Sequence, residues 1–79
     1  MMNFAAIFFF ETSDDELRKH LEETAARWGA VQLPDRGWGF QKPGKPIEEF
    51  LYLLWVHRET LDHRAVLYGG WRSLYRERS

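Results

Sequence analysis

The stretch that decides the fold is Phe4-Ala5-Ala6-Ile7-Phe8-Phe9-Phe10, followed closely by Ser13-Asp14-Asp15-Glu16. An aromatic, apolar run without helical spacing predicts a strand over residues 3–10. Ser13 and Glu16 have the spacing of a capping box, which predicts that a helix begins here. Apolar and small residues then recur at helical spacing up to Trp28, and Gly29 stands where a left-handed C-cap residue belongs. The sequence therefore predicts a strand and then a helix over residues 14–28.

Working outward, the rest of the chain predicts a hairpin, a second helix and a last strand. Two short apolar runs, residues 30–33 and 38–41, flank the turn Pro34-Asp35-Arg36-Gly37 and predict a β-hairpin. Pro46 suits the first position of a helix, and apolar residues at helical spacing follow it. We expect this helix to end near residues 57–58, because residues 64–68 read better as a strand.

The predicted order of elements is strand, helix, strand, strand, helix, strand, in one domain of 79 residues. This is the order of the ferredoxin-like α+β sandwich, which has a four-stranded antiparallel sheet and both helices on one face. Side chains alternate between the faces of a strand, so residues 4–10 place apolar groups on both faces. Two helices cover only one face. The sequence therefore predicts a homodimer, or a folded-back C-terminal tail, as cover for the other.

Composition excludes several classes of function. Lys and Arg number 11 against 12 Asp and Glu, which argues against a polycationic nucleic-acid binder and against an acidic DNA mimic. The absence of cysteine removes disulfides, thiolate nucleophiles and thiolate metal sites. The apolar run 4–10 has no basic region before it and is shorter than the ~20 residues of a membrane span. We expect a cytoplasmic protein without membrane contact.

No catalytic or metal motif emerges from the remaining residues. His57 and His63 are six residues apart, so they would lie on different sides of a helix and could not chelate a metal from it. Ser13 is assigned to the helix cap, and no serine stands in a nucleophile-elbow motif. Gly37-Trp38-Gly39 lacks the third glycine of a phosphate-binding loop. We expect no metal, no cofactor and no enzymatic site.

The opening of the chain resembles a known group of proteins. Residues 8–15, 17–21 and 28–32 together are similar to the start of the small CRISPR spacer-acquisition proteins and of the VapD-type toxin ribonucleases. The resemblance covers about 30 residues and implies a dimeric ferredoxin-like fold. It also implies a metal-dependent nuclease site at an aspartate that ends the first strand, and Glu11 stands at that position here.

Surface aromatic and basic residues are the candidates for binding. Trp38 and Arg36 belong to the predicted hairpin, and a basic, aromatic segment ends the chain. Interleaved rings and guanidinium groups suit either a protein interface or stacking on bases. The candidate binding residues are Arg36, Trp38, Trp71, Arg72, Tyr75 and Arg76. Trp28 and Trp55 are instead expected in the core.

These observations favour a small non-enzymatic protein that occludes or regulates a macromolecular partner. Inhibitors carried by phages and mobile elements, including anti-CRISPR proteins, are one class that fits. A protein is the expected partner, and the basic C-terminal segment offers nucleic acid as the alternative. The alternative function is a metal-dependent dimeric ribonuclease that uses Glu11 and Asp14.

Overall fold

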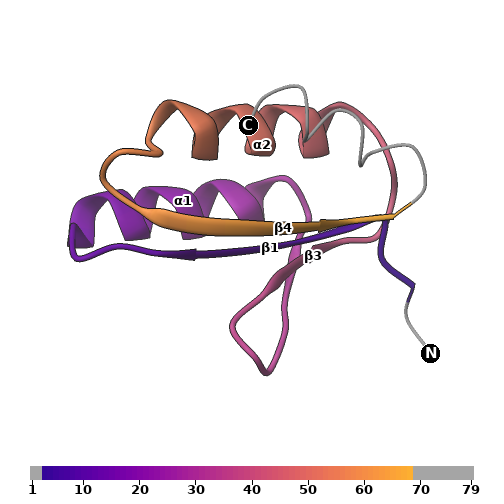
Figure 1. Cartoon of the computed structure of the whole chain (residues 1–79). Coiled ribbons are helices and arrows are strands. Elements are labelled where there is room, and N and C mark those ends of the chain that lie inside the picture. Colours follow the sequence, from indigo (N-terminus) through magenta and orange to yellow (C-terminus); the bar gives the residue numbers. More distant parts are fainter. Residues whose placement is uncertain (1–2, 69–79) are drawn as a thin grey trace.

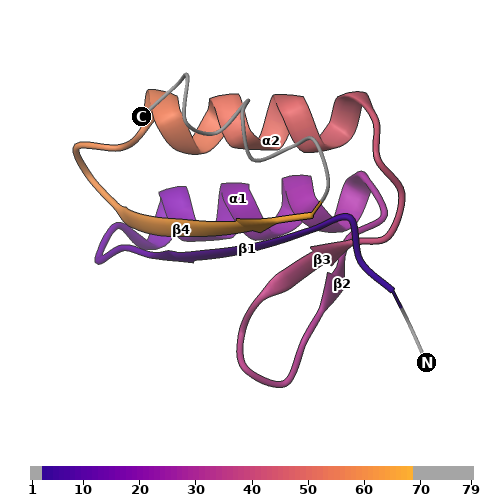
Figure 2. The ribbon, with the colours of Figure 1, turned by 45° about the vertical axis from the view of Figure 1, so that its right-hand side comes forward.

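A computed structural model describes residues 3–68 of the chain. Its elements, in order, are β1 (Ala6–Glu11), α1 (Asp15–Arg27), β2 (Val31–Gln32), β3 (Trp38–Phe40), α2 (Lys45–Val56) and β4 (Asp62–Leu67). The four strands form one antiparallel sheet in the order β2-β3-β1-β4. Both helices lie on one side of it (Figures 1 and 2). The prediction of an α+β fold is confirmed, and α2 ends where the sequence indicated.

The core lies between this sheet and the helices, and Phe50 of α2 is at its centre. The ring of Phe50 lies 5.2 Å from that of Phe8 and 5.6 Å from that of Phe40, centroid to centroid. Trp28 meets it edge-on at 6.3 Å. Ala6 and Phe8 are fully buried, whereas Ile7 and Phe9, each the next residue along the strand, are only half-buried. The predicted alternation therefore holds within β1, but Phe4 before it departs from the prediction and lies against Gly39, on the face of Ile7.

The start of α1 differs from the prediction by one residue. The N-cap is Asp14, whose Oδ1 accepts the backbone N–H of Leu17 at 3.1 Å. Ser13 is exposed and is not the cap. Thr12 explains the shift, because its Oγ1 accepts the N–H of Asp14 at 3.1 Å and so fixes the residue from which the helix begins.

The end of α1 is as predicted. Gly29 has a φ of +85°, the left-handed conformation that glycine adopts without steric cost. The N–H of Gly29 donates to the carbonyl of Ala26 at 3.0 Å, and the N–H of Ala30 donates to that of Ala25 at 2.9 Å. These two bonds are the Schellman pattern, and they turn the chain directly into β2.

Two tryptophans are placed differently from the predictions. Trp38 is 8% exposed, so its assignment to an accessible hairpin surface is wrong. It is the first residue of β3 and the register partner of Phe8, and paired residues share a face of the sheet. Trp38 therefore points toward the helices. Trp55, expected in the core, is only half-buried, with the guanidinium of Arg58 3.9 Å from its ring centroid.

Candidate functional site

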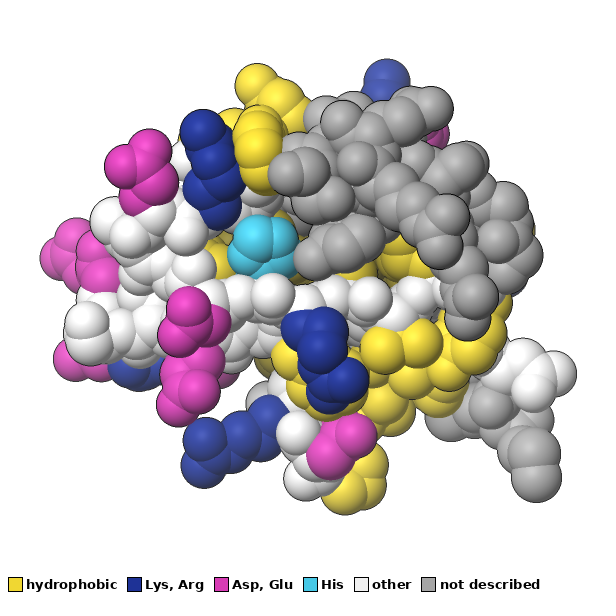
Figure 3. Space-filling view, in the orientation of Figure 1, with side chains coloured by type: hydrophobic (Ala, Val, Ile, Leu, Met, Phe, Trp, Pro, Cys, Tyr) yellow, Lys and Arg dark blue, Asp and Glu magenta, His cyan; other side chains and the backbone are white. Residues whose placement is uncertain are grey.

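The face of the sheet opposite the helices carries a patch of apolar side chains. Ile7 of β1 is the register partner of Val66 in β4, and Phe9 is the partner of Arg64. Tyr68 continues the alternation of β4 and is 49% exposed. Figure 3 shows hydrophobic side chains gathered on this side of β4. We call Phe4, Ile7, Phe9, Val66 and Tyr68 the open-face patch.

Part of this face is covered by the chain itself. A Cβ atom at Gly37 would lie 2.9 Å from Ile7 Cγ2 and 2.9 Å from Phe9 Cε1. At Gly39 it would lie 2.5 Å from Phe4 Cδ1. All three distances are shorter than an ordinary carbon–carbon contact, so the absence of a Cβ at these glycines lets the side chains lie directly on the backbone near β3. The remaining surface of the patch stays half-exposed.

The hairpin turn brings Arg36 to the edge of this face. The N–H of Leu33 donates to the carbonyl of Gly37 at 2.7 Å, and the N–H of Arg36 donates to that of Leu33 at 3.0 Å. The turn itself is as predicted. Its left-handed residue, however, is Arg36, with a φ of +73°, a conformation that costs a non-glycine residue about 1–2 kcal/mol.

A charged cluster lies at the end of the open face where β1 stops. A pocket of about 310 Å³ opens here, with Phe9 among its lining residues. We call four of the residues that line it, Glu11, Arg36, Asp62 and Arg64, the charged end. Glu11 and Asp62 are register partners, so two carboxylates stand side by side on neighbouring strands. The guanidinium of Arg64 lies 4.4 Å from the centroid of the Phe9 ring.

The charges of the charged end are not paired with one another. The ion pairs within residues 3–68 are Arg18–Asp15 at 2.8 Å and Lys45–Glu49 at 3.9 Å. Neither involves Glu11, Arg36, Asp62 or Arg64. Two acidic and two basic side chains on one face are thus left available to a molecule that binds there.

His63 borders the same pocket from the other side of β4. Its register partner is Phe10, so it points toward the helices. Partial burial lowers the pKa of His63 below its ordinary value of 6.5, and the carboxylate of Asp62 acts in the opposite direction. The neutral imidazole is therefore favoured in the folded state.

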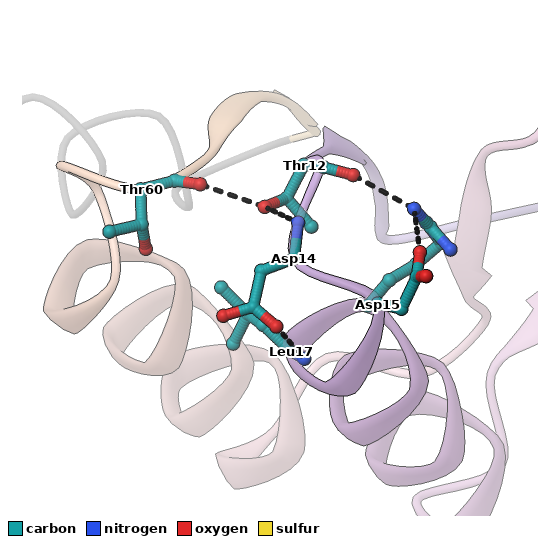
Figure 4. A network of polar contacts seen from close by, with 6 residues as sticks. Thr12, Asp14, Asp15, Leu17 and Thr60 are labelled. Carbon is teal, nitrogen blue, oxygen red and sulfur yellow. Dashed lines mark hydrogen bonds and ion pairs between the residues drawn. The ribbon is translucent and has the colours of Figure 1, made fainter.

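A polar network holds the chain in place beside the charged end (Figure 4). Thr12, which follows Glu11, donates its hydroxyl to the carbonyl of Thr60 at 2.8 Å. Arg18 donates to the carbonyl of Thr12 at 3.0 Å and pairs with Asp15. The end of β1, the start of α1 and the segment before β4 are thus tied together. This junction fixes the backbone positions of Glu11 and Asp62.

Three further features predicted from the sequence concern a metal site, the alternative nuclease site and a membrane span. Within residues 3–68, no group of three or more His, Cys, Asp or Glu side chains is placed to hold a metal ion. Asp14, assigned with Glu11 to the alternative nuclease site, caps α1 with its carboxylate. The helices described between residues 3 and 68 are too short, or too polar, to cross a membrane.

Of the candidate binding residues, the structure places only Arg36 at this site. Trp38 lies in the core, and Trp71, Arg72, Tyr75 and Arg76 lie outside the described residues. Sequence reasoning missed Asp62 and Arg64 as site residues. The available signal was the alternation of charge in Asp62-His63-Arg64 at the start of the last strand. Comparison with protein-family models, curated proteins and solved structures found no match for this chain.

Proposed function

We propose that this protein is a small non-enzymatic binding module that contacts a protein partner through the open-face patch and so occludes or regulates that partner. The observation that carries the proposal is the half-exposed apolar patch, flanked by arginines that have no ion pair within residues 3–68. Burying one large apolar side chain is worth about 1.5–3 kcal/mol. Aromatic residues and arginine also dominate the energetic centres of protein interfaces.

We also propose that the fold is ferredoxin-like. The strand order, taken from β4, is β4-β1-β3-β2, and the elements follow the βαββαβ order. Both features are typical of that fold. In such a sandwich the helices leave one sheet face free, which supports the use of this face for binding.

The charges of the face favour a protein over a nucleic acid. Phosphate groups that approached Arg36 and Arg64 would also meet the carboxylates of Glu11 and Asp62, which line the same pocket. A nucleic-acid surface usually presents clustered positive charge instead. A protein surface with an apolar centre and side chains of both signs suits this face better.

The test begins with a photo-reactive amino acid at Val66, compared with the same group at Glu23, an exposed position on α1. The protein cross-linked from Val66 alone is identified, purified and titrated against the full chain. We expect Tyr68→Ala and Arg36→Ala each to weaken binding about tenfold or more, with unchanged melting temperature. Glu23→Ala should bind as the unmodified chain does.

Three results would overturn the proposal. The first is equal affinity of the purified partner for the Tyr68→Ala variant, and the second is cross-linking to RNA or DNA only. The third is cleavage of RNA or DNA that requires Mg²⁺ or Mn²⁺ and is abolished by Glu11→Gln. That result would replace the binding module with the ribonuclease alternative.

A further inference from the structure

From Asp62 to Ala65, the outer side of β4 has no neighbouring strand within residues 3–68. β4 has six residues and neighbours only β1, whereas the strand at the opposite edge, β2, has two. The N–H of Tyr68 donates to the carbonyl of Ala5 at 3.1 Å. Because backbone groups alternate sides along a strand, those of Arg64 face β1 as well. The backbone groups of His63 and Ala65 therefore point outward.

The same strand carries an electrostatic conflict. Glu11 and Asp62 stand directly opposite each other, and like charges in this arrangement destabilise a sheet. No ion pair within residues 3–68 relieves them. Arg64 lies two residues further along on the same face and stacks on Phe9. It has no carboxylate partner within the described chain. One copy thus leaves both the acidic pair and the arginine uncompensated.

We propose that a second copy of this chain pairs its β4 antiparallel with β4, with the two His63 residues opposite each other on the two-fold axis. In this register Arg64 of each copy stands opposite Asp62 of the other, next to Glu11. The outward backbone groups of His63 are then directed at each other, as a hydrogen-bonded antiparallel pair requires. This one contact gives the outward backbone groups hydrogen-bond partners and sets the arginine of each copy beside the acidic pair of the other.

The neighbouring registers do not achieve this. Paired residues must lie on the same face of the sheet, so an even-numbered residue of one strand must stand opposite an even-numbered residue of the other. The partner strand can therefore shift only by two residues at a time. One such step in either direction places Arg64 opposite Arg64, or Asp62 opposite Asp62. A further step along the strand sets Arg64 against Val66 and leaves the acids uncompensated. Charge complementarity therefore selects the His63 register and a second copy as the occupant.

This dimer goes beyond the proposed function, because it pairs the edge of the sheet. It uses the side chains of Asp62 and Arg64 and leaves the open-face patch and Arg36 free for a partner. The two sheets would join into one, with both open-face patches on the same side. A net charge of −1 per chain adds little repulsion between the copies. A partner could then be held by two patches at once, which raises the overall affinity without new kinds of contact.

Disulfide trapping tests the register, because the chain contains no cysteine. In the His63→Cys variant the two introduced thiols lie on strands whose Cα atoms are about 5.5 Å apart, within reach of a disulfide. In the Ala65→Cys variant the two sites are about 14 Å apart along the strands. Mild oxidation should give a covalent dimer with His63→Cys and almost none with Ala65→Cys. Equal trapping of both variants, or no trapping of His63→Cys, would overturn the proposal.

Charge exchange tests the partner contacts. Arg64→Asp places like charges opposite each other twice, so the dissociation constant of the dimer should rise about tenfold or more in sedimentation equilibrium. Combining it with Asp62→Arg restores opposite charges at both positions and should restore the dimer. Circular dichroism verifies that both variants fold. A folded double variant that stays monomeric, or an unmodified chain that is monomeric at about 100 μM, would refute the dimer.

Discussion

Replacing Thr12 with valine should destabilise this protein, whereas the same replacement at Thr24 should not. Both threonines are buried, at 8% and 5% exposure. Thr12 Oγ1 donates to the carbonyl of Thr60 and accepts from the N–H of Asp14, and each such bond is worth about 1 kcal/mol. Thr12→Val should therefore cost about 2 kcal/mol. For a domain of this size that lowers the melting temperature by roughly 8–16 °C.

Thr24 provides the matched control. Its Oγ1 is buried without a hydrogen-bond partner among the described residues. Thr24→Val replaces this unsatisfied hydroxyl with a methyl group of similar volume, so we expect no loss and up to about 1 kcal/mol gained. Urea denaturation of the two variants measures both free energies of unfolding on the same scale. Equal losses for the two variants would show that the Thr12 junction does not stabilise the fold.

Three further predictions follow from burial, close packing and titration. Trp38→Ala should cost about 3–5 kcal/mol in urea denaturation, because its side chain is buried beside Phe8; a loss below about 1 kcal/mol would contradict its place in the core. Gly39→Ala should lower the melting temperature, because a Cβ there would collide with Phe4, and Phe4→Ala in the same chain should recover part of the loss. Burial lowers the pKa of His63 below 6.5, so the unfolded chain takes up its proton first, and stability should fall as the pH drops from about 6.5 through the lower folded-state pKa. His63→Gln should remove that part of the pH dependence of the melting temperature, and an unchanged dependence would assign it to other groups.

The overall architecture could be predicted because its signals are local. The apolar residues at positions 4–10 predicted a strand of which the helices cover one face and leave the other uncovered. Ile7 and Phe9 are indeed less buried than Phe8. Gly29 ends α1 in the predicted left-handed conformation. Both signals depend on neighbours within a few residues, and such patterns are visible in sequence.

The errors came from choices between adjacent residues. Ser13 and Asp14 are both good N-cap residues, and only the hydroxyl of Thr12 on the N–H of Asp14 decides between them. Trp38 follows the glycine of the turn. A residue at this position can belong either to the exposed turn of the hairpin or to the strand that follows it. The register with Phe8 decides for the strand. Arg36 adopts the left-handed conformation of the turn, although Gly37 stands next to it. Gly37 is needed at its own position instead, because a Cβ there would collide with Ile7 and Phe9.

The charged end required knowledge of the strand register, which no local pattern contains. Glu11 and Asp62 are far apart in sequence and meet only because β1 and β4 are antiparallel in one register. That register is fixed by burial, since a slip of one residue would turn Leu67 out of the core and Arg64 into it. The fold therefore cannot relieve the two carboxylates by shifting the strand. A single Lys in place of Asp62 would relieve them within one chain. The acidic residue at that position instead becomes favourable once an arginine from another β4 stands opposite it, which is the arrangement that the charge exchange between Asp62 and Arg64 tests.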